Sequence, residues 1–333
     1  MISPLTWLSL SHYSPAIMPL ELIIIFSYPC REVNSNEEFQ MLWLWRKRIG
    51  AEVANAASRE PSTSPLLVPS ELAVKSGLVD PVARGAAVEI AGITVPLDLT
   101  NRHERDYFVR HYLRVPHPQA DVDRLIFKAF VRPGDVTLDA GCNIGMTIAE
   151  LLEAGSYHVH AFEAVPSLYA RVEAIKDSRF TGYSCALGDG DGTISIWVSQ
   201  AHNQGSTIEP RMVEHFAPIF GDEPISQEVP LRRLDDVCAG ISFDFMKVDV
   251  EGAEAAFLRG ATKTLSNHPP RAMSMELFDR FFDEAKTEAD KYFSQCHRCF
   301  ILKSDYSLYL ADWSEPHNGD LYHFTSPTYL FTN

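Results

Sequence analysis

Basic residues are scarce in this 333-residue sequence, where 29 Lys and Arg stand against 44 Asp and Glu and the formal net charge is −15. Proteins whose main partner is a phosphate backbone usually carry a basic surface. The basic stretch "WRKRIG" at 45–50 is short and isolated. The composition therefore argues against nucleic acid as the main partner, and a hydrophobic fraction of 46% is ordinary for a soluble globular protein.

Long hydrophobic runs and a cysteine framework are also missing. The apolar stretch "LELIIIFSY" at 20–28 is interrupted by Glu21 and is too short to cross a membrane. No clear basic region and cleavage site precede Cys30, as a signal peptide would require. Cys142 and Cys185 fall in segments expected to be interior, which favours a reducing compartment. We expect a cytoplasmic protein, and membrane association or targeting through the N-terminal stretch stays open.

The chain divides into three parts. Residues 1–60 show no sustained periodicity, and we expect an N-terminal extension that is poorly ordered or packs locally. Residues 61–132 begin in a Ser- and Pro-rich linker. The same part then contains "AVEIAGITVPLDL", a predicted hairpin with its turn at Ala91-Gly92, and "ADVDRLIFKAFVRPGD", a predicted lead-in helix. Residues 133–333 form the main domain.

Strand and helix patterns alternate through the main domain. The expected strands are "VTLDAG", "YHVHAFE", "GYSCALG", "FDFMKVDV" and "RAMSMEL", with later helices over 253–265 and 283–295. "GTISIWVS" and "QEVPLRRL" predict an added hairpin around a short helix near 211–216, and "CFILK" and "TYLFT" predict further strands. Such alternation gives a parallel sheet covered on both faces. We predict a doubly wound, Rossmann-like α/β fold, mostly parallel, with an antiparallel C-terminal edge.

The turn "VTLDAGCNIGMT" between the first strand and its helix is rich in glycine. In such folds ligands bind at the carboxyl ends of the strands. Gly141 permits a tight turn that a ligand can approach, and Gly145 lets the helix pack close to the strand. Asn143 stands where the G-x-G-x-x-G fingerprint has its middle glycine, so the strict dinucleotide pattern fails. Alone, this turn is a weak signal for a nucleotide-type ligand.

An acidic residue at the end of the second strand strengthens that signal. "HVHAFEAVP" places Glu163 18 residues after Gly145, where a carboxylate can accept hydrogen bonds from both hydroxyls of a ribose. A ribose-bearing cofactor is therefore expected. Hydride transfer from NAD and methyl transfer from S-adenosylmethionine compete at this point. The zwitterionic methionine tail suits Asp139 and the N–H groups of the turn, whereas a pyrophosphate would want the missing glycine.

Several blocks together resemble the FkbM family of S-adenosylmethionine-dependent methyltransferases, which have the class I methyltransferase fold. The matching blocks are "PGDVTLDAGCNIGMT", "VHAFEAVPSLYARV", "ALGDGDGTISI", "VPLRRLDDV" and "FMKVDVEGAEAAFLRGA", and they span about residues 133–276. The "DVEGAE" block is the most specific of these and the glycine turn the least. Ala164 departs from the family, which often has proline after the acid, and residues 1–60 share nothing recognisable with it.

The resemblance implies a role for each matching position. The residues around the methionine part of the cofactor would be Asp139, Gly141, Cys142, Asn143 and Gly145. Glu163 would hold the ribose, and Ala186 and Leu187, at the end of the third strand, would flank the adenine, with Asp189 less closely matched. The family methylates oxygen atoms, often of sugar or polyketide hydroxyls. The implied acceptor is a hydroxyl of a small molecule or a glycoside.

Carboxylates supply the remaining candidates. Asp249 ends a strand beside the expected position of the methyl group, and Glu276 ends the next strand. The candidate catalytic residues are Asp249, Glu251 and Glu276, any of which could take the proton of a hydroxyl. Asp249 and Glu276 are also candidate ligands of Mg²⁺, with direct anchoring of the acceptor as the alternative. Glu254 lies in the first turn of the next helix, where an acid favours the helix dipole.

The sequence thus predicts an S-adenosylmethionine-dependent O-methyltransferase. Two alternatives stay open: an NAD(P)-dependent oxidoreductase and a non-catalytic module that binds S-adenosylmethionine.

Overall fold

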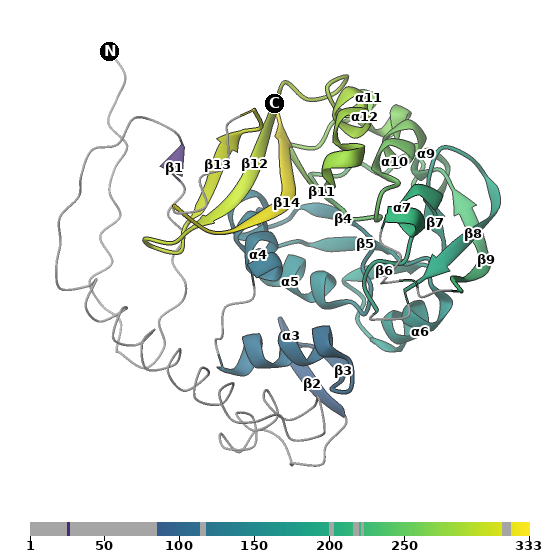
Figure 1. Cartoon of the computed structure of the whole chain (residues 1–333), viewed down its shortest axis with the longest axis horizontal. Helices are drawn as coiled ribbons and strands as arrows, with labels where there is room; N and C mark the ends of the chain where they lie inside the picture. The colour runs from purple at the N-terminus through teal and green to yellow at the C-terminus, as the bar shows by residue number, and fades with distance from the viewer. Residues whose placement is uncertain are drawn as a thin grey trace.

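The computed structural model describes residues 25–26, 85–113, 118–199, 203–215, 220, 223–314 and 321–333 (Figure 1). The expected N-terminal extension over 1–60 lies outside the described residues, apart from the two-residue strand β1 (Ile25–Phe26). The Ser- and Pro-rich linker lies outside them as well. Within the described ranges, no helix is long and apolar enough to span a membrane.

The described strands form one large sheet in the order β1-β13-β12-β14-β11-β10-β4-β5-β6. Its parallel part consists of β4 (Val136–Ala140), β5 (His158–Phe162), β6 (Phe180–Tyr183), β10 (Phe245–Val248) and β11 (Ala272–Glu276). Its antiparallel edge consists of β12 (Gln295–Leu302), β13 (Leu308–Asp312) and β14 (Tyr322–Thr332). The predicted doubly wound sheet with an antiparallel C-terminal edge is confirmed.

Helices cover both faces of this sheet (Figure 1). One layer contains α4 (Pro118–Phe130), α5 (Met146–Ala154) and α6 (Pro166–Ala174), and the other contains α9 (Leu234–Val237), α10 (Glu254–Gly260), α11 (Thr262–Asn267) and α12 (Asp279–Ala289). Along β10, Phe245 packs in the core of the first layer, whereas Met246 and Val248 pack in the core of the second. Because side chains alternate along a strand, Lys247 faces the α4–α5 layer.

A hairpin and a helix precede the main sheet and pack beside it. The hairpin joins β2 (Gly85–Ile90) and β3 (Ile93–Asp98) through Ala91-Gly92, whose φ angles of +52° and +78° confirm the predicted turn. Arg179 donates a hydrogen bond to the carbonyl of Ala91. Buried hairpin residues share the α4–α5 core, and α3 (Arg102–Leu113) follows below α5 in Figure 1. This part of the chain therefore shares a core with the sheet.

Several predicted elements differ from those observed. "GYSCALG" is not one strand: it ends β6 and then forms β7 (Ala186–Leu187), which pairs with β9 (Ile225–Arg232) in a separate sheet with β8 (Gly192–Val198). The change arises because β9 supplies the backbone partners of β7. The helix expected over 253–265 divides at Ala261 into α10 and α11, the last predicted helix begins four residues earlier, at Asp279, and β13 was not predicted. The short helix is α7 (Pro210–His215).

Candidate active site

The glycine turn lies where the strand order reverses, between β4 and β10. Ligand crevices of doubly wound sheets open at such a point, at the carboxyl ends of the strands. Gly141 has a φ of +85°, and a Cβ on it would lie 1.9 Å from the carbonyl oxygen of Asp249. A Cβ on Gly145, which precedes α5, would lie 2.8 Å from the side chain of Ile175. The turns after β4 and β10 are thus in backbone contact, which only glycine at 141 allows.

Glu163 follows β5 and is held by two backbone donors. Its carboxylate accepts hydrogen bonds from the N–H groups of Asn143 (2.9 Å) and Val165 (2.8 Å). Burial raises the pKa of Glu163 to about 7, against the opposing effect of these two donors. Glu163 is 7% exposed, so its carboxyl group is oriented by the fold before any ligand binds.

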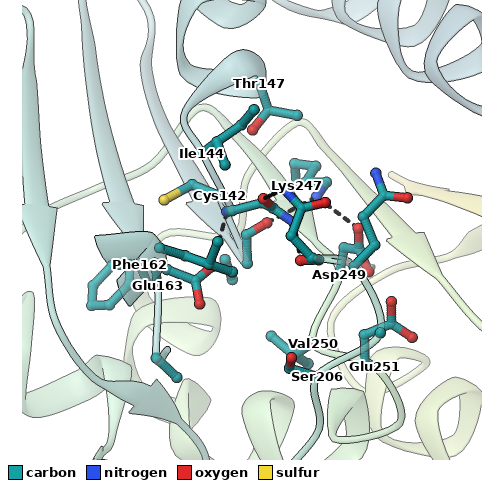
Figure 2. Close-up of a pocket in the computed structure, with 18 of the residues that line it drawn as sticks. Cys142, Ile144, Thr147, Phe162, Glu163, Ser206, Lys247, Asp249, Val250 and Glu251 are labelled. Carbon is teal, nitrogen blue, oxygen red and sulfur yellow. Dashed lines mark hydrogen bonds and ion pairs between the residues drawn. The ribbon is translucent and has the colours of Figure 1, made fainter. Parts of the chain in front are cut away.

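A single pocket connects the glycine turn, Glu163 and the acids after β10 (Figure 2). The predicted site residues that line it are Gly141, Cys142, Asn143, Glu163, Ala186, Leu187, Asp249, Glu251 and Glu276. Asp139 and Gly145 do not line it: Asp139 is fully buried, and Gly145 packs against α6 and its C-cap. Ala186 and Leu187 reach the pocket from β7, in the second sheet, rather than from the end of a third parallel strand.

Lys247 is a functional candidate that the sequence reasoning missed. Its ammonium lies 2.9 Å from Asp249 Oδ2 and 3.9 Å from Asp139 Oδ1, and it donates to the carbonyl of Gly141 at 3.4 Å. Figure 2 shows its side chain beside Asp249. Burial lowers the pKa of Lys247, but Asp249, Asp139 and Asp123 outweigh this effect and hold the pKa well above its ordinary value. The available signal was a charge inside the apolar strand "FMKV".

This lysine bears on the expected Mg²⁺ site. It places a positive charge between the carboxylates of Asp139 and Asp249. Among the described side chains, no group of three or more His, Cys, Asp or Glu is placed to hold a metal ion. The Mg²⁺ prediction for Asp249 and Glu276 therefore finds no support in the donor set, because hard cations need several oxygen ligands converging on one point.

The other acids at this end of the pocket are weak acids. Burial raises the pKa of Glu251 well above its ordinary value, with Asp249 and Glu254 adding to the effect. Burial also raises the pKa of Glu276 well above its ordinary value, and the charges of Asp249 and Glu251 raise it further. Asp123, which α4 brings to the pocket, has its pKa raised by burial to about 7. A raised pKa makes the ionised form of a carboxyl group a stronger base, which suits it to accept a proton during catalysis.

The turn after β10 carries backbone strain at Glu251, whose φ of +53° is unusual for a residue with a side chain. The hydroxyl of Thr207 donates to the Glu251 carbonyl oxygen at 2.6 Å. Glu254 accepts hydrogen bonds from the N–H groups of Val250 and Gly252 and does not line the pocket. Glu254 therefore stabilises the turn, while Glu251 presents its carboxyl group to the pocket.

Residues far in sequence from the glycine turn and from β10 complete the wall of the pocket. Tyr107 of α3 and Asp123 of α4 line the pocket, as does the segment Asn203–Ser206. The Gln204 side chain donates to the Tyr107 hydroxyl at 3.2 Å. Sequence reasoning missed Tyr107 and Asp123, because a contact such as that of Tyr107 with Gln204 joins positions 97 residues apart and follows no local pattern.

Comparison with known proteins identifies the segment that carries this pocket. Residues 139–299 match the family model of the methyltransferase FkbM domain. This segment, called the FkbM domain after the model that it matches, covers just under half of the chain. The glycine turn, Glu163, the acids after β10 and Glu276 all fall within the FkbM domain, whereas Tyr107 and Asp123 precede it.

Solved structures of methyltransferases are similar to the chain at low sequence identity. Methyltransferase FkbM from Methylobacillus flagellatus is 16% identical, with a TM-score of 0.33 over 70% of this chain and 49% of that chain. The match therefore spans about half the length of that protein. A TehB-like SAM-dependent methyltransferase from Corynebacterium glutamicum is 12% identical, with a TM-score of 0.37 over 69% of this chain and 96% of that one. No curated protein matches the sequence.

Proposed function

We propose that the protein is an S-adenosylmethionine-dependent O-methyltransferase that acts on a hydroxyl of a small-molecule or glycosidic acceptor. The main support is that the glycine turn, Glu163 and the acids after β10 line one pocket of an FkbM methyltransferase domain. The same domain match disfavours an NAD(P)-dependent oxidoreductase, as does Asn143 in the fingerprint. The retained acids argue against a non-catalytic binding module.

The residues of the pocket fit this cofactor. Glu163 keeps lone pairs beyond the two that its backbone donors occupy, so it can accept hydrogen bonds from ribose hydroxyls. Ala186 and Leu187 offer buried apolar surface to an adenine ring. Gly141 and Cys142 line the pocket at the carboxyl end of β4, beside the turn that Asp249 begins. S-adenosylmethionine supplies an electrophilic methyl group on a sulfonium centre.

The acceptor end of the pocket is built for hydroxyl donors. A hydroxyl that attacks a methyl group must lose its proton, and a positioned carboxylate can accept it. We assign that role to Glu251 and Glu276, whose raised pKa values make them better bases than ordinary carboxylates. Asp249, paired with Lys247, would orient the acceptor.

Isothermal titration with S-adenosylhomocysteine tests the cofactor assignment. We expect the wild-type protein to bind it and Glu163→Ala to bind it at least tenfold more weakly, about the effect of losing charge-assisted hydrogen bonds. A well-folded protein that does not bind, with Glu163→Ala no different, would refute the assignment.

A screen of hydroxylated acceptors with methyl-labelled cofactor tests the reaction. Turnover should be unchanged by EDTA, and Glu251→Gln and Glu276→Gln should each lower it by about 10²- to 10⁴-fold, the usual effect of losing a general base. Loss of turnover in EDTA, restored by Mg²⁺, would instead return Asp249 and Glu276 to the role of metal ligands.

A further inference from the structure

Asn143, in the glycine turn, has a left-handed backbone with a φ of +51°. Asparagine tolerates this conformation better than most residues, but it still needs support from its surroundings. Asn203, from the segment that follows β8, contacts its side chain twice. The side-chain amide of Asn143 donates to the backbone carbonyl of Asn203 at 2.7 Å, and the side-chain amide of Asn203 donates to Asn143 Oδ1 at 3.2 Å.

The conformation of Asn143 determines where its backbone N–H points. This N–H donates to Glu163 Oε2 at 2.9 Å, while the N–H of Val165 binds the other oxygen at 2.8 Å. The two donors together set the plane of the Glu163 carboxyl group. Any rotation of the Asn143 backbone would therefore release one side of Glu163.

Asn203 is in turn held from outside the FkbM domain. Its amide also donates to Glu104 Oε1 at 2.9 Å, and Glu104 is only 1% exposed at the start of α3. Arg171 of α6 donates to both oxygens of Glu104, at 2.8 and 2.6 Å. The Glu104 carboxylate is thus fixed by a bidentate ion pair and orients the Asn203 amide toward Asn143.

We propose that Asn203 is a positioning residue for cofactor binding, which holds Asn143 so that its N–H keeps Glu163 in the orientation that accepts the ribose. This rests on the proposed function, in which Glu163 binds the ribose of S-adenosylmethionine. Glu104 acts one step further away by orienting Asn203. Residues before the FkbM domain therefore contribute to cofactor affinity without touching the cofactor.

A double-mutant cycle on S-adenosylhomocysteine affinity tests the proposal, because it measures whether Asn203 acts through Glu163. Asn203→Ala removes two side-chain hydrogen bonds and should raise the Kd about three- to tenfold. In a Glu163→Ala background the same change should alter the Kd by less than about twofold. Asn203→Asp has the same shape but places a carboxylate beside Glu104, and it should lose at least as much affinity as the alanine variant.

Asn101→Ala is the matched control, and thermal unfolding checks that each variant is folded. Asn101 caps α3 by accepting from the N–H groups of His103 at 3.0 Å and Glu104 at 3.4 Å, so its loss loosens the backbone at the helix start and leaves the side-chain bonds among Asn143, Asn203 and Glu104 in place. Its Kd should stay within about twofold of wild type. An equal effect of Asn203→Ala with and without Glu163, or an Asn101→Ala effect as large as that of Asn203→Ala, would overturn the proposal. A folded wild-type protein that binds no S-adenosylhomocysteine would instead refute the proposed function itself.

Discussion

Replacing Gly141 with alanine should destabilise the protein for two reasons: the new side chain clashes with a neighbouring turn, and alanine is strained in a left-handed backbone. A comparison with a second glycine separates the two costs. At Gly141 the φ is +85°, and the new Cβ would lie 1.9 Å from the carbonyl oxygen of Asp249 and 3.1 Å from its carbonyl carbon. Backbone atoms cannot rotate away as a flexible side chain can, so either β4 or β10 must move at its carboxyl end. Asp249, the turn that it begins and the pocket wall would move with it.

Gly134 offers a matched comparison. Its φ is +96°, and a Cβ on it would meet nothing within 4 Å. Gly134→Ala should therefore cost only the conformational term, about 1–2 kcal/mol. Gly141→Ala should cost that term plus about 1–3 kcal/mol for overpacking, or about 2–5 kcal/mol in all. The overpacking difference is large enough to resolve in paired urea denaturation curves.

Two measurements on the same pair of variants test this reasoning. Urea denaturation should show Gly141→Ala to be the less stable variant. Titration with S-adenosylhomocysteine should show a Kd for Gly134→Ala within about twofold of wild type, and a loss of at least tenfold for Gly141→Ala, because the wall of the pocket has moved. Equal stability and equal affinity of the two alanine variants would show that the contact with Asp249 does not constrain the site.

Three further predictions concern buried polar groups. Lys247→Met should lower the free energy of unfolding by about 3–5 kcal/mol at pH 8, because it leaves the buried carboxylate of Asp139 and the half-buried one of Asp249 without their cation. The loss should be smaller at pH 5, as urea curves at both pH values would show. Burial raises the pKa of Glu163 from 4.5 to about 7, so between these values the folded protein holds a proton that the unfolded chain has released, and stability falls as pH rises. Glu163→Gln should remove this fall with pH in the same assay, but its amide nitrogen cannot accept from Asn143 or Val165, so the variant should be less stable than wild type at pH 5 by about 1–3 kcal/mol. Thr207→Val should cost about 1–3 kcal/mol in thermal or urea unfolding by leaving the Glu251 carbonyl without its donor and the Glu209 N–H without its acceptor, whereas Thr207→Ser should be close to wild type.

Elements whose signals are local could be predicted from the sequence. The turn at Ala91-Gly92, the strand ending in Asp139-Ala140 and the acid after β5 all depend on a few neighbouring residues, and the structure has them where the sequence placed them. The strand predicted at 182–188 shows the limit of this reasoning. Its residues favour an extended chain, but which sheet they join is decided by β9, more than 40 residues later.

The candidate site divides in the same way. Gly141 and Glu163 could be found from their spacing, because a turn and a strand end have recognisable local patterns. Lys247 was overlooked because a charge in a short buried strand acquires its meaning only from Asp139 on the neighbouring strand, with which it pairs in register. Asn203 has no pattern at all, since its partners lie 60 and 99 residues away.

Order along the chain was therefore enough to establish the doubly wound sheet, the end of the sheet at which ligands bind and the acids that follow β5 and β10. Hydrophobic periodicity and turn chemistry act over a few residues and survive in a one-dimensional pattern. Tertiary structure decided which charges pair, which acids become weak acids through burial, and which distant segments close the pocket. These properties depend on distances through space and on exclusion of water, and neither is fixed until the helices pack on the sheet.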